Sequence, residues 1–203
     1  MIVVGLTGSI AMGKSETAKM FATRGIPVFD SDAAVHRLYG RGGEAVAAIA
    51  ALAPSAIDDG SVDRRKLATL IQTDPALLPR IEAAVHPLVR AMQSKFLSET
   101  AAAGVDIAVL DIPLLFETGR EKDVDLVLVV SAGDAKQRER ALQRPGMTAD
   151  KLDFILSRQV PDVEKRTRAD YVISTSTSLE DTAREVDHFI EQLRTEGRDQ
   201  HGA

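Results

Sequence analysis

The chain has 203 residues, 44% of them hydrophobic, and a formal net charge of −5, which suits one domain with a well-packed core and argues against a general nucleic-acid binder. It contains no cysteine, which excludes disulfides, thiolate catalysis and cysteine-based metal sites. The opening apolar run is too short for a signal peptide and no run approaches the roughly 18 residues of a membrane span, so we expect a soluble cytoplasmic protein without a membrane partner.

The N-terminal region has the pattern of a β-α-β unit. Residues 2–6 form a short apolar run that a glycine-containing loop closes, which predicts a buried strand. Residues 15–23 carry apolar side chains at helical spacing, which predicts a helix that ends near Gly25. Residues 26–32 predict a second short strand that finishes in two carboxylates. This order implies a parallel sheet flanked by helices.

The middle of the chain changes character. Residues 33–103 show helical spacing with few strand signals, and residues 76–104 are the longest such piece. Pro87 either begins a new helical turn or kinks a long helix. An all-helical block of this kind between two strands predicts an inserted subdomain that binds a substrate.

Sheet signals return in the second half of the chain. Residues 106–113 and 125–130 are rich in β-branched side chains and have the size of buried strands, and residues 169–175 predict a last short strand. A basic helix, interrupted at a Pro-Gly pair, lies before that last strand. An amphipathic helix over residues 179–194 closes the fold, and residues 197–203 are expected to fray.

The stretch from Gly8 to Ser15 has the G-x-x-x-x-G-K-S spacing of a phosphate-binding loop. Such a loop points backbone N–H groups and a helix N-terminus at a polyphosphate, while Lys14 contacts the phosphate oxygens and the Ser15 hydroxyl binds Mg²⁺. Gly8 and Gly13 allow the turn and the close approach of the backbone. The alternative is a chance match, but the motif follows an apolar strand and opens a helix, as a working loop requires.

Carboxylates at strand ends are candidates for the rest of a phosphoryl-transfer site. Asp30 and Asp32 close the second strand, where period-two alternation puts both on one side, and either can orient an acceptor hydroxyl. Alternatively, Ser31 or Asp32 only caps the following helix. Asp111 ends a later strand and is a candidate Mg²⁺ ligand, directly or through water, or else a turn cap before Pro113.

Positive charge gathers in one segment of the chain. Between Lys136 and Arg168 stand nine Lys or Arg residues and five acidic residues, although the chain is negative overall. This distribution indicates a local site for a small polyanion, or alternatively only a solvated, arginine-rich helical face.

Eight segments of the sequence occur in an order that points to one family. They are VGLTGSIAMGKS (4–15), GIPVFDSD (25–32), VDRRKL (62–67), VHPLVR (85–90), IPLLFE (112–117), RALQRPG (140–146), SRQ (157–159) and RADYVI (168–173). Through them the chain resembles the dephospho-CoA kinase family over residues 2–190. The phosphate loop alone is shared by many enzymes, but its combination with Asp-x-Asp, His-Pro and Pro-Leu-Leu-Phe-Glu is specific.

The resemblance implies an α/β fold of the P-loop kinase type, in three layers with a five-stranded parallel sheet. The core would comprise residues 1–31, 104–137 and 169–196, with a helical CoA-binding subdomain at about 32–103 and a helical lid at about 138–168. The implied reaction is ATP-dependent phosphorylation of the ribose 3′-hydroxyl of dephospho-CoA, which gives CoA and ADP in the last step of CoA biosynthesis. The implied partners are these two small molecules with Mg²⁺, and we expect a monomer with at most weak self-association that binds no nucleic acid.

The resemblance also implies roles for single residues. Asp32 would be the base that orients the 3′-hydroxyl, Lys14 would hold ATP, and Arg140 would neutralise charge on the transferred phosphoryl group. Mg²⁺ would be bound by Ser15 and Asp111. The ATP-binding set would be Gly8, Ala11, Met12, Gly13, Lys14, Ser15, Glu16, Arg140 and Arg144. The acceptor-binding set would be Asp32, Arg64, His86, Arg90 and Leu115.

Two of these assignments have simpler alternatives. His86 and Arg90 are four residues apart and would share one face of a continuous helix, but His86 could instead cap a helix or pack before Pro87. Residues 114–116 could only pack the exit of their strand and leave Glu117 as the exposed polar group.

Several positions depart from the family pattern. Ser9 and Ala11 each replace a glycine of the loop, Glu16 replaces a threonine, and STST at 174–177 stands where the family has Asp-Asn and a small residue. An adenine contact by that Asn therefore has no counterpart here. Ala11 must keep a negative φ or carry strain of about 1 kcal/mol. We expect the Glu16 carboxylate to point away from the phosphates.

Two other functions compete with this interpretation. Another nucleotide or nucleoside kinase would share the loop, but the long helical insertion after Asp32 suits a larger acceptor. A GTP-dependent switch would need an Asn-Lys-x-Asp type motif after a strand, which the sequence lacks.

Overall fold

The computed structural model describes residues 1–199 and divides the chain into two compact units. The first unit comprises Met1–Val28 together with the chain from Thr100 onward, and the second unit is Phe29–Glu99. Each unit is described by itself below. Among the helices of the described residues, none is long and apolar enough to cross a membrane.

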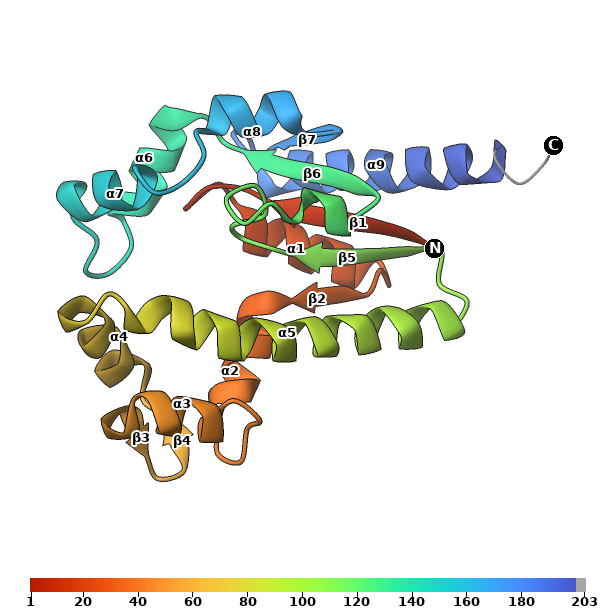
Figure 1. Ribbon diagram of the computed structural model, residues 1–203. Helices are drawn as coiled ribbons and strands as arrows, with labels where there is room; N and C mark the ends of the chain where they lie inside the picture. The colour runs from red at the N-terminus through yellow and green to blue at the C-terminus, as the bar shows by residue number, and fades with distance from the viewer. Residues whose placement is uncertain (200–203) are drawn as a thin grey trace. The chain divides into compact units, whose positions relative to one another are not determined.

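A five-stranded sheet carries the phosphate loop (Figure 1). Its strand order is β2-β5-β1-β6-β7, and β1 pairs in parallel with both β5 and β6, while β6 pairs in parallel with β7. The predicted parallel sheet is therefore confirmed. The strands are β1 (Ile2–Thr7), β2 (Val28–Asp30), β5 (Ile107–Asp111), β6 (Leu126–Ser131) and β7 (Tyr171–Ser174).

Strands β5 and β6 are apolar up to their last residue because both faces of the sheet are covered there. All five residues of β5 and five of the six in β6 are buried. Strands buried on both faces read as continuous apolar runs rather than alternating ones, which is why these segments were recognisable from sequence. Gly5 of β1 also lies close to a neighbour, since a Cβ there would stand 2.7 Å from Leu115 Cδ1.

Helices of the first unit pack around this sheet. They are α1 (Lys14–Thr23), α6 (Asp134–Leu142), α7 (Ala149–Leu156), α8 (Asp162–Arg168) and α9 (Leu179–Asp199), with a short 3₁₀ turn η2 (Arg120–Asp123). The predicted Pro-Gly interruption falls between α6 and α7, and Thr148 caps α7 by accepting a hydrogen bond from Lys151 N at 3.3 Å. The closing helix is longer than predicted: it runs through residues 197–199, which we expected to fray, and residues 200–203 lie outside the described part.

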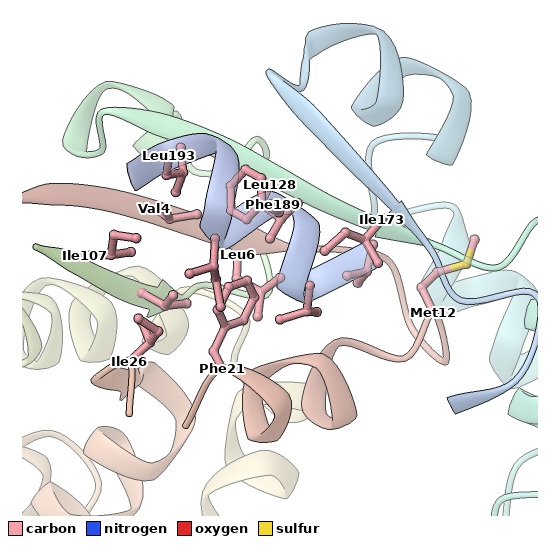
Figure 2. Close-up of a cluster of buried hydrophobic side chains, with 14 of the residues drawn as sticks. Val4, Leu6, Met12, Phe21, Ile26, Ile107, Leu128, Ile173, Phe189 and Leu193 are labelled. Atoms are coloured by element: carbon pink, nitrogen blue, oxygen red, sulfur yellow. The ribbon is translucent and has the colours of Figure 1, made fainter. Parts of the chain in front are cut away.

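The main core joins the sheet to α1 and α9 (Figure 2). Phe189 of α9 stands at its centre, with its ring 6.2 Å from the ring of Phe21 and 4.8 Å from that of Tyr171. Met12 lies at the edge of this cluster, where it anchors the loop after β1. Burial of such side chains contributes about 1.5–3 kcal/mol each, so the loop is attached to the most stable part of the unit.

The second unit is mostly helical but contains a small hairpin. Its elements are α2 (Ser31–Tyr39), α3 (Val46–Leu52), the 3₁₀ turn η1 (Pro54–Ala56), β3 (Ile57–Asp58), β4 (Ser61–Val62), α4 (Arg64–Thr73) and α5 (Leu77–Ala102), which extends into the first unit. The expectation of an all-helical block is therefore wrong. Asp59 and Gly60 both have positive φ, 41° and 72°, and an Asp-Gly pair between short strands is a hairpin signal that the sequence analysis overlooked.

α5 is one continuous helix through Pro87, which settles the alternative left open for this residue. Proline removes one backbone hydrogen bond from a helix interior, so the helix must be held by packing. Its buried residues recur every four positions, at Leu77, Ile81, Val85 and Val89. This apolar stripe compensates for the missing hydrogen bond and keeps the exposed face of the helix regular.

Candidate active site

The phosphate loop connects β1 to α1, and both glycines of its motif are required by its geometry. Gly13 is the N-cap residue of α1, with φ of 89°, a left-handed conformation that glycine adopts without the strain of a Cβ. A Cβ at Gly8 would stand 2.8 Å from the carbonyl oxygen of Val130, so the loop passes too close to β6 for any side chain. The loop therefore directs the N-terminus of α1, with its positive dipole end, toward the space above the sheet.

Ala11 has φ of 62°, so of the two alternatives stated for this residue the strained one holds. An L-residue in the left-handed region costs about 1–2 kcal/mol relative to glycine. The Ala11 methyl group is buried and packs in a small cluster with Ala141 and Leu152. The methyl group thus joins the phosphate loop to the helix pair α6 and α7.

Lys14 and Asp111 form an ion pair at the carboxyl end of β5. Lys14 is the first residue of α1 and Asp111 is the last of β5, so the strand order brings together two residues 97 positions apart. Asp111 is only 5% exposed. A buried carboxylate beside a lysine and next to a helix N-terminus is a site where cations and phosphate oxygens can meet.

The residues on either side of Lys14 differ in what they offer. Ser15 is exposed in the first turn of α1. Glu16 is also exposed, and its carboxylate accepts a hydrogen bond from Lys19 Nζ at 2.7 Å along the helix surface. Met12 has a fully buried side chain, and its carbonyl oxygen accepts a hydrogen bond from the Thr175 hydroxyl at 2.8 Å. For Met12, therefore, only the backbone can face a ligand.

Arg140 of α6 is held beside the loop by Thr175. Its guanidinium donates to the Thr175 carbonyl oxygen at 2.8 Å, and Thr175 in turn binds Met12 as described above. Arg144 is exposed just after the end of α6. Arg138 on the same helix donates to Asp153 of α7 at 2.8 Å, and this hydrogen bond holds the pKa of Asp153 below its usual range. The arginine-rich segment is thus not a uniform solvated face, because its members have different partners.

Leu115, which the resemblance assigns to the acceptor, has a fully buried side chain that packs against Gly5. This burial agrees with the alternative in which the segment packs the exit of β5. Leu114 is the exposed apolar residue of the segment, at 42%. Phe116 lies under the guanidinium of Arg168, 4.4 Å from the ring centroid.

In the second unit, the structure distinguishes the two carboxylates of the Asp-x-Asp pair. β2 ends at Asp30, which is the N-cap of α2, and its side chain accepts a hydrogen bond from Ala33 N at 2.9 Å. The expectation that Asp30 and Asp32 share one side of a strand is wrong, because Ser31 already begins the helix. Asp32 is exposed in the first helical turn, and its carboxylate makes no hydrogen bond or ion pair to any residue that the structure describes.

The other residues predicted for the acceptor also lie on the surface of the second unit. Arg64 is the first residue of α4, whose N-cap is Asp63. Backbone hydrogen bonds, led by that of Lys66, hold the pKa of Asp63 below its usual range. His86 and Arg90 are both exposed and share a face of the continuous helix α5, so His86 neither caps a helix nor packs in the interior.

Comparison with known proteins decides the family. Residues 2–181 match the sequence profile of dephospho-CoA kinases. A dephospho-CoA kinase of Mesorhizobium japonicum is 56% identical over 194 residues, covering 96% of this chain and 98% of the relative. The chain belongs to the dephospho-CoA kinase family. Its reaction is therefore the phosphorylation of dephospho-CoA, the final step of CoA biosynthesis, with ATP as co-substrate.

Solved structures agree with this assignment. The crystal structure of a Thermus thermophilus protein matches with a TM-score of 0.82 and 35% identity, covering 95% of this chain and 97% of that one. A dephospho-CoA kinase from Campylobacter jejuni matches with a TM-score of 0.67 and 19% identity, covering 94% and 96% of the two chains, which supports the fold. The predicted family, P-loop kinase fold and enzyme class are thus confirmed.

One buried ion pair of the first unit was missed from the sequence. Glu117, the last residue of the Pro-Leu-Leu-Phe-Glu motif, forms an ion pair with Lys165 of α8, whose Nζ lies 2.9 Å from Glu117 Oε1. Lys165 is fully buried and the Glu117 side chain is 11% exposed. The suggestion that Glu117 is the exposed polar group is therefore wrong. Lys165 stands in a basic, helical stretch without any local sign of burial, so only the tertiary structure could identify it.

Proposed function

We propose that the phosphate loop of the first unit binds the phosphates of ATP and that Asp32 of the second unit is the base for the 3′-hydroxyl of dephospho-CoA. The observation that carries the ATP half is the pairing of Lys14 with Asp111 at the N-terminus of α1. The observation that carries the acceptor half is that the two carboxylates differ in their contacts. Asp30 caps a helix, while the Asp32 carboxylate is exposed and has no partner among the described residues.

On the ATP side, the loop supplies charge and direction. Backbone N–H groups of the loop and of the first turn of α1 bind phosphate oxygens, and the dipole of α1 favours their negative charge. Lys14 contacts the β- and γ-phosphates and exchanges part of its interaction with Asp111 for them. Of the predicted set, Gly8, Ala11, Met12, Gly13 and Glu16 contribute through the backbone, because their side chains are missing, buried or paired elsewhere.

Mg²⁺ fits the groups at this position. The residues that the structure describes contain no cluster of three or more His, Cys, Asp or Glu that could hold a metal by itself. Mg²⁺ in kinases needs no such cluster, since it keeps several waters and takes one or two protein ligands plus phosphate oxygens. The hydroxyl of exposed Ser15 and the carboxylate of Asp111 would hold the ion, which would neutralise charge on the β- and γ-phosphates.

Arg140 and Arg144 would bind the transferred phosphoryl group from the predicted lid, residues 138–168. Arg140 is already positioned next to the loop through Thr175, and its planar guanidinium suits phosphate oxygens better than a lysine would. Closure of such a segment would also exclude water, which otherwise competes with the 3′-hydroxyl for the phosphoryl group.

The acceptor half of the site would use Asp32, Arg64, His86 and Arg90. Asp32 accepts a hydrogen bond from the 3′-hydroxyl and orients it for attack on the γ-phosphorus. It takes the proton as the new P–O bond forms and the bond from the γ-phosphorus to the β-phosphate oxygen breaks, which releases ADP. The cationic and neutral donors on α4 and α5 suit the phosphate groups of dephospho-CoA. The protein would act on these small molecules in the cytoplasm, as a monomer.

A substrate-competition assay tests the proposal. ADP formation is measured with dephospho-CoA, AMP, shikimate and pantothenate as acceptors, and CoA is identified as the product. The proposal expects turnover with dephospho-CoA and none above background with the other three. ADP formation without CoA, or phosphorylation at a position other than the 3′-hydroxyl, would contradict it.

A further inference from the structure

Two glutamine side chains bind the backbone of a single residue, Ile10, in the middle of the phosphate loop. Gln137 of α6 donates from Nε2 to the Ile10 carbonyl oxygen at 2.9 Å. Gln159, which follows α7, accepts through Oε1 from Ile10 N at 3.1 Å. Ile10 immediately precedes the strained residue Ala11. Neither glutamine belongs to the sets assigned above to ATP, the acceptor or Mg²⁺.

The two hydrogen bonds determine how the loop presents its donors. In a trans peptide the C=O and the following N–H point in opposite directions, so holding the Ile10 carbonyl against Gln137 aims the Ala11 N–H away from it, toward the other side of the loop. Holding the Ile10 N–H on Gln159 withdraws that group from any phosphate. Ala11 can then keep φ of 62° although it is not glycine.

Gln159 is itself fixed by the buried ion pair described above. The next residue, Val160, donates from its backbone N to Glu117 Oε1 at 2.8 Å, and the same oxygen lies 2.9 Å from Lys165 Nζ in the ion pair. The ion pair thus holds the backbone at Val160, and through it the neighbouring residue Gln159, which binds Ile10. The Pro-Leu-Leu-Phe-Glu motif is thereby connected to the phosphate loop.

Gln137 is fixed by its place in α6. It is 5% exposed, and it stands three residues before Arg140 on the same helix. A displacement of α6 would therefore move both the anchor of the loop and the arginine that lies beside it. Both glutamines also line a pocket of about 400 Å³ next to Ser9, so shortening either side chain leaves space that water can enter without collapse of the fold.

We propose that Gln137 and Gln159 are positioning residues that hold the phosphate loop in its ATP-binding form. Their hydrogen bonds to Ile10 would offset the strain of the left-handed conformation of Ala11. The inference rests on the proposed binding of ATP by the loop. It predicts that loss of either hydrogen bond weakens ATP binding, because a buried backbone group left without its partner disfavours the bound geometry of the loop. The affinity for dephospho-CoA should stay within about twofold of the wild type.

The same substitution at the two positions must have opposite consequences. Ile10 offers an acceptor to Gln137 and a donor to Gln159. Glutamate keeps an acceptor oxygen but loses the donor. Gln159→Glu therefore preserves its hydrogen bond, whereas Gln137→Glu sets a carboxylate against a carbonyl oxygen. Both variants add the same charge beside the same residue, so repulsion of ATP is common to both.

The experiment measures the dissociation constant of ATP by calorimetry, KM for dephospho-CoA and the melting temperature for each variant. We expect Gln137→Glu to bind ATP about tenfold more weakly than Gln159→Glu. Gln159→Ala should also lose about tenfold, and Gln159→Glu should recover most of that loss. Gln72→Glu, an exposed position on α4, controls for added charge and should match the wild type.

Two outcomes would overturn the inference: equal ATP affinity in Gln137→Glu and Gln159→Glu, or a fall in melting temperature without any change in ATP affinity. Lys14→Ala, measured in the same series, separates this failure from that of the ATP site. If Lys14→Ala loses ATP binding while the glutamine variants keep it, only the positioning role fails. If Lys14→Ala binds ATP as the wild type does, the proposed ATP site fails as well.

Discussion

Replacing Ala11 by glycine separates backbone strain from side-chain packing in the phosphate loop. Ala11 has φ of 62° and its methyl group is buried against Ala141 and Leu152. Removal of the Cβ relieves about 1–2 kcal/mol of left-handed strain. Against this, the buried methyl group is worth about 0.8 kcal/mol, and the more flexible glycine stabilises the unfolded chain by about 0.4–1 kcal/mol. These contributions nearly cancel, so Ala11→Gly should change the free energy of unfolding by less than about 0.5 kcal/mol.

Ala141→Gly is the matched control, since Ala141 lies in the same cluster but inside helix α6. It loses a similar methyl group without any strain to relieve, and glycine in a helix interior costs about 0.5–1 kcal/mol. Together with the methyl group this predicts destabilisation by about 1.3–1.8 kcal/mol.

Urea unfolding at neutral pH measures both changes from the transition midpoint at a common slope. The two variants should differ by about 1.5 kcal/mol, with Ala11→Gly the more stable. If Ala11→Gly were as destabilised as Ala141→Gly, the left-handed conformation of Ala11 would carry no strain and the reasoning would be refuted.

Three further predictions concern charged groups. Lys165→Met should destabilise the protein by about 3–5 kcal/mol, because it leaves the mostly buried Glu117 carboxylate without its cationic partner. The double variant with Glu117→Gln should recover much of that loss, as urea unfolding would report. Lys14→Ala should raise the ATP dissociation constant and lower kcat, while KM for dephospho-CoA stays unchanged. Calorimetry measures the dissociation constant, and steady-state kinetics measures kcat and KM. Arg24 donates a hydrogen bond to Asp187 and holds the pKa of the Asp187 carboxyl group below its usual range. The pair therefore stabilises the fold at pH values above about 4, the pKa of an aspartate in the unfolded chain. This stabilisation is lost as the pH falls through the lower pKa of Asp187 in the folded protein. Asp187→Asn should therefore flatten the acid limb of a stability-against-pH curve.

Features with a local signature were predictable from the sequence. The buried strands β5 and β6 are continuous apolar runs, and the phosphate loop has fixed spacing between a strand and a helix. The hairpin at Asp59 and Gly60 also had a local signature and was overlooked. It interrupts a region whose helical periodicity is strong on both sides.

Features that depend on tertiary neighbours were not predictable. The burial of Leu115 follows from its packing on Gly5, and nothing near it in the sequence separates it from exposed Leu114. The proposed positioning role of Gln137 and Gln159 depends on the hydrogen bonds that both make to the backbone of Ile10, which lies far from them in the sequence. Likewise, Asp30 and Asp32 do not share one side of a strand, because β2 stops at Asp30 and α2 begins at Ser31, and a run of seven residues does not specify where that change occurs.

The central claim, that Asp32 is the base for the acceptor hydroxyl, is tested most directly by comparing Asp32→Asn with Asp30→Asn. Asn caps helices as well as Asp does, so Asp30→Asn removes a nearby charge while it keeps the cap of α2. Turnover of dephospho-CoA at saturating ATP should fall by about 10²–10⁴-fold in Asp32→Asn, with the ATP dissociation constant unchanged, and stay within about threefold in Asp30→Asn. Full turnover in Asp32→Asn, or an equal loss in both variants, would contradict the claim.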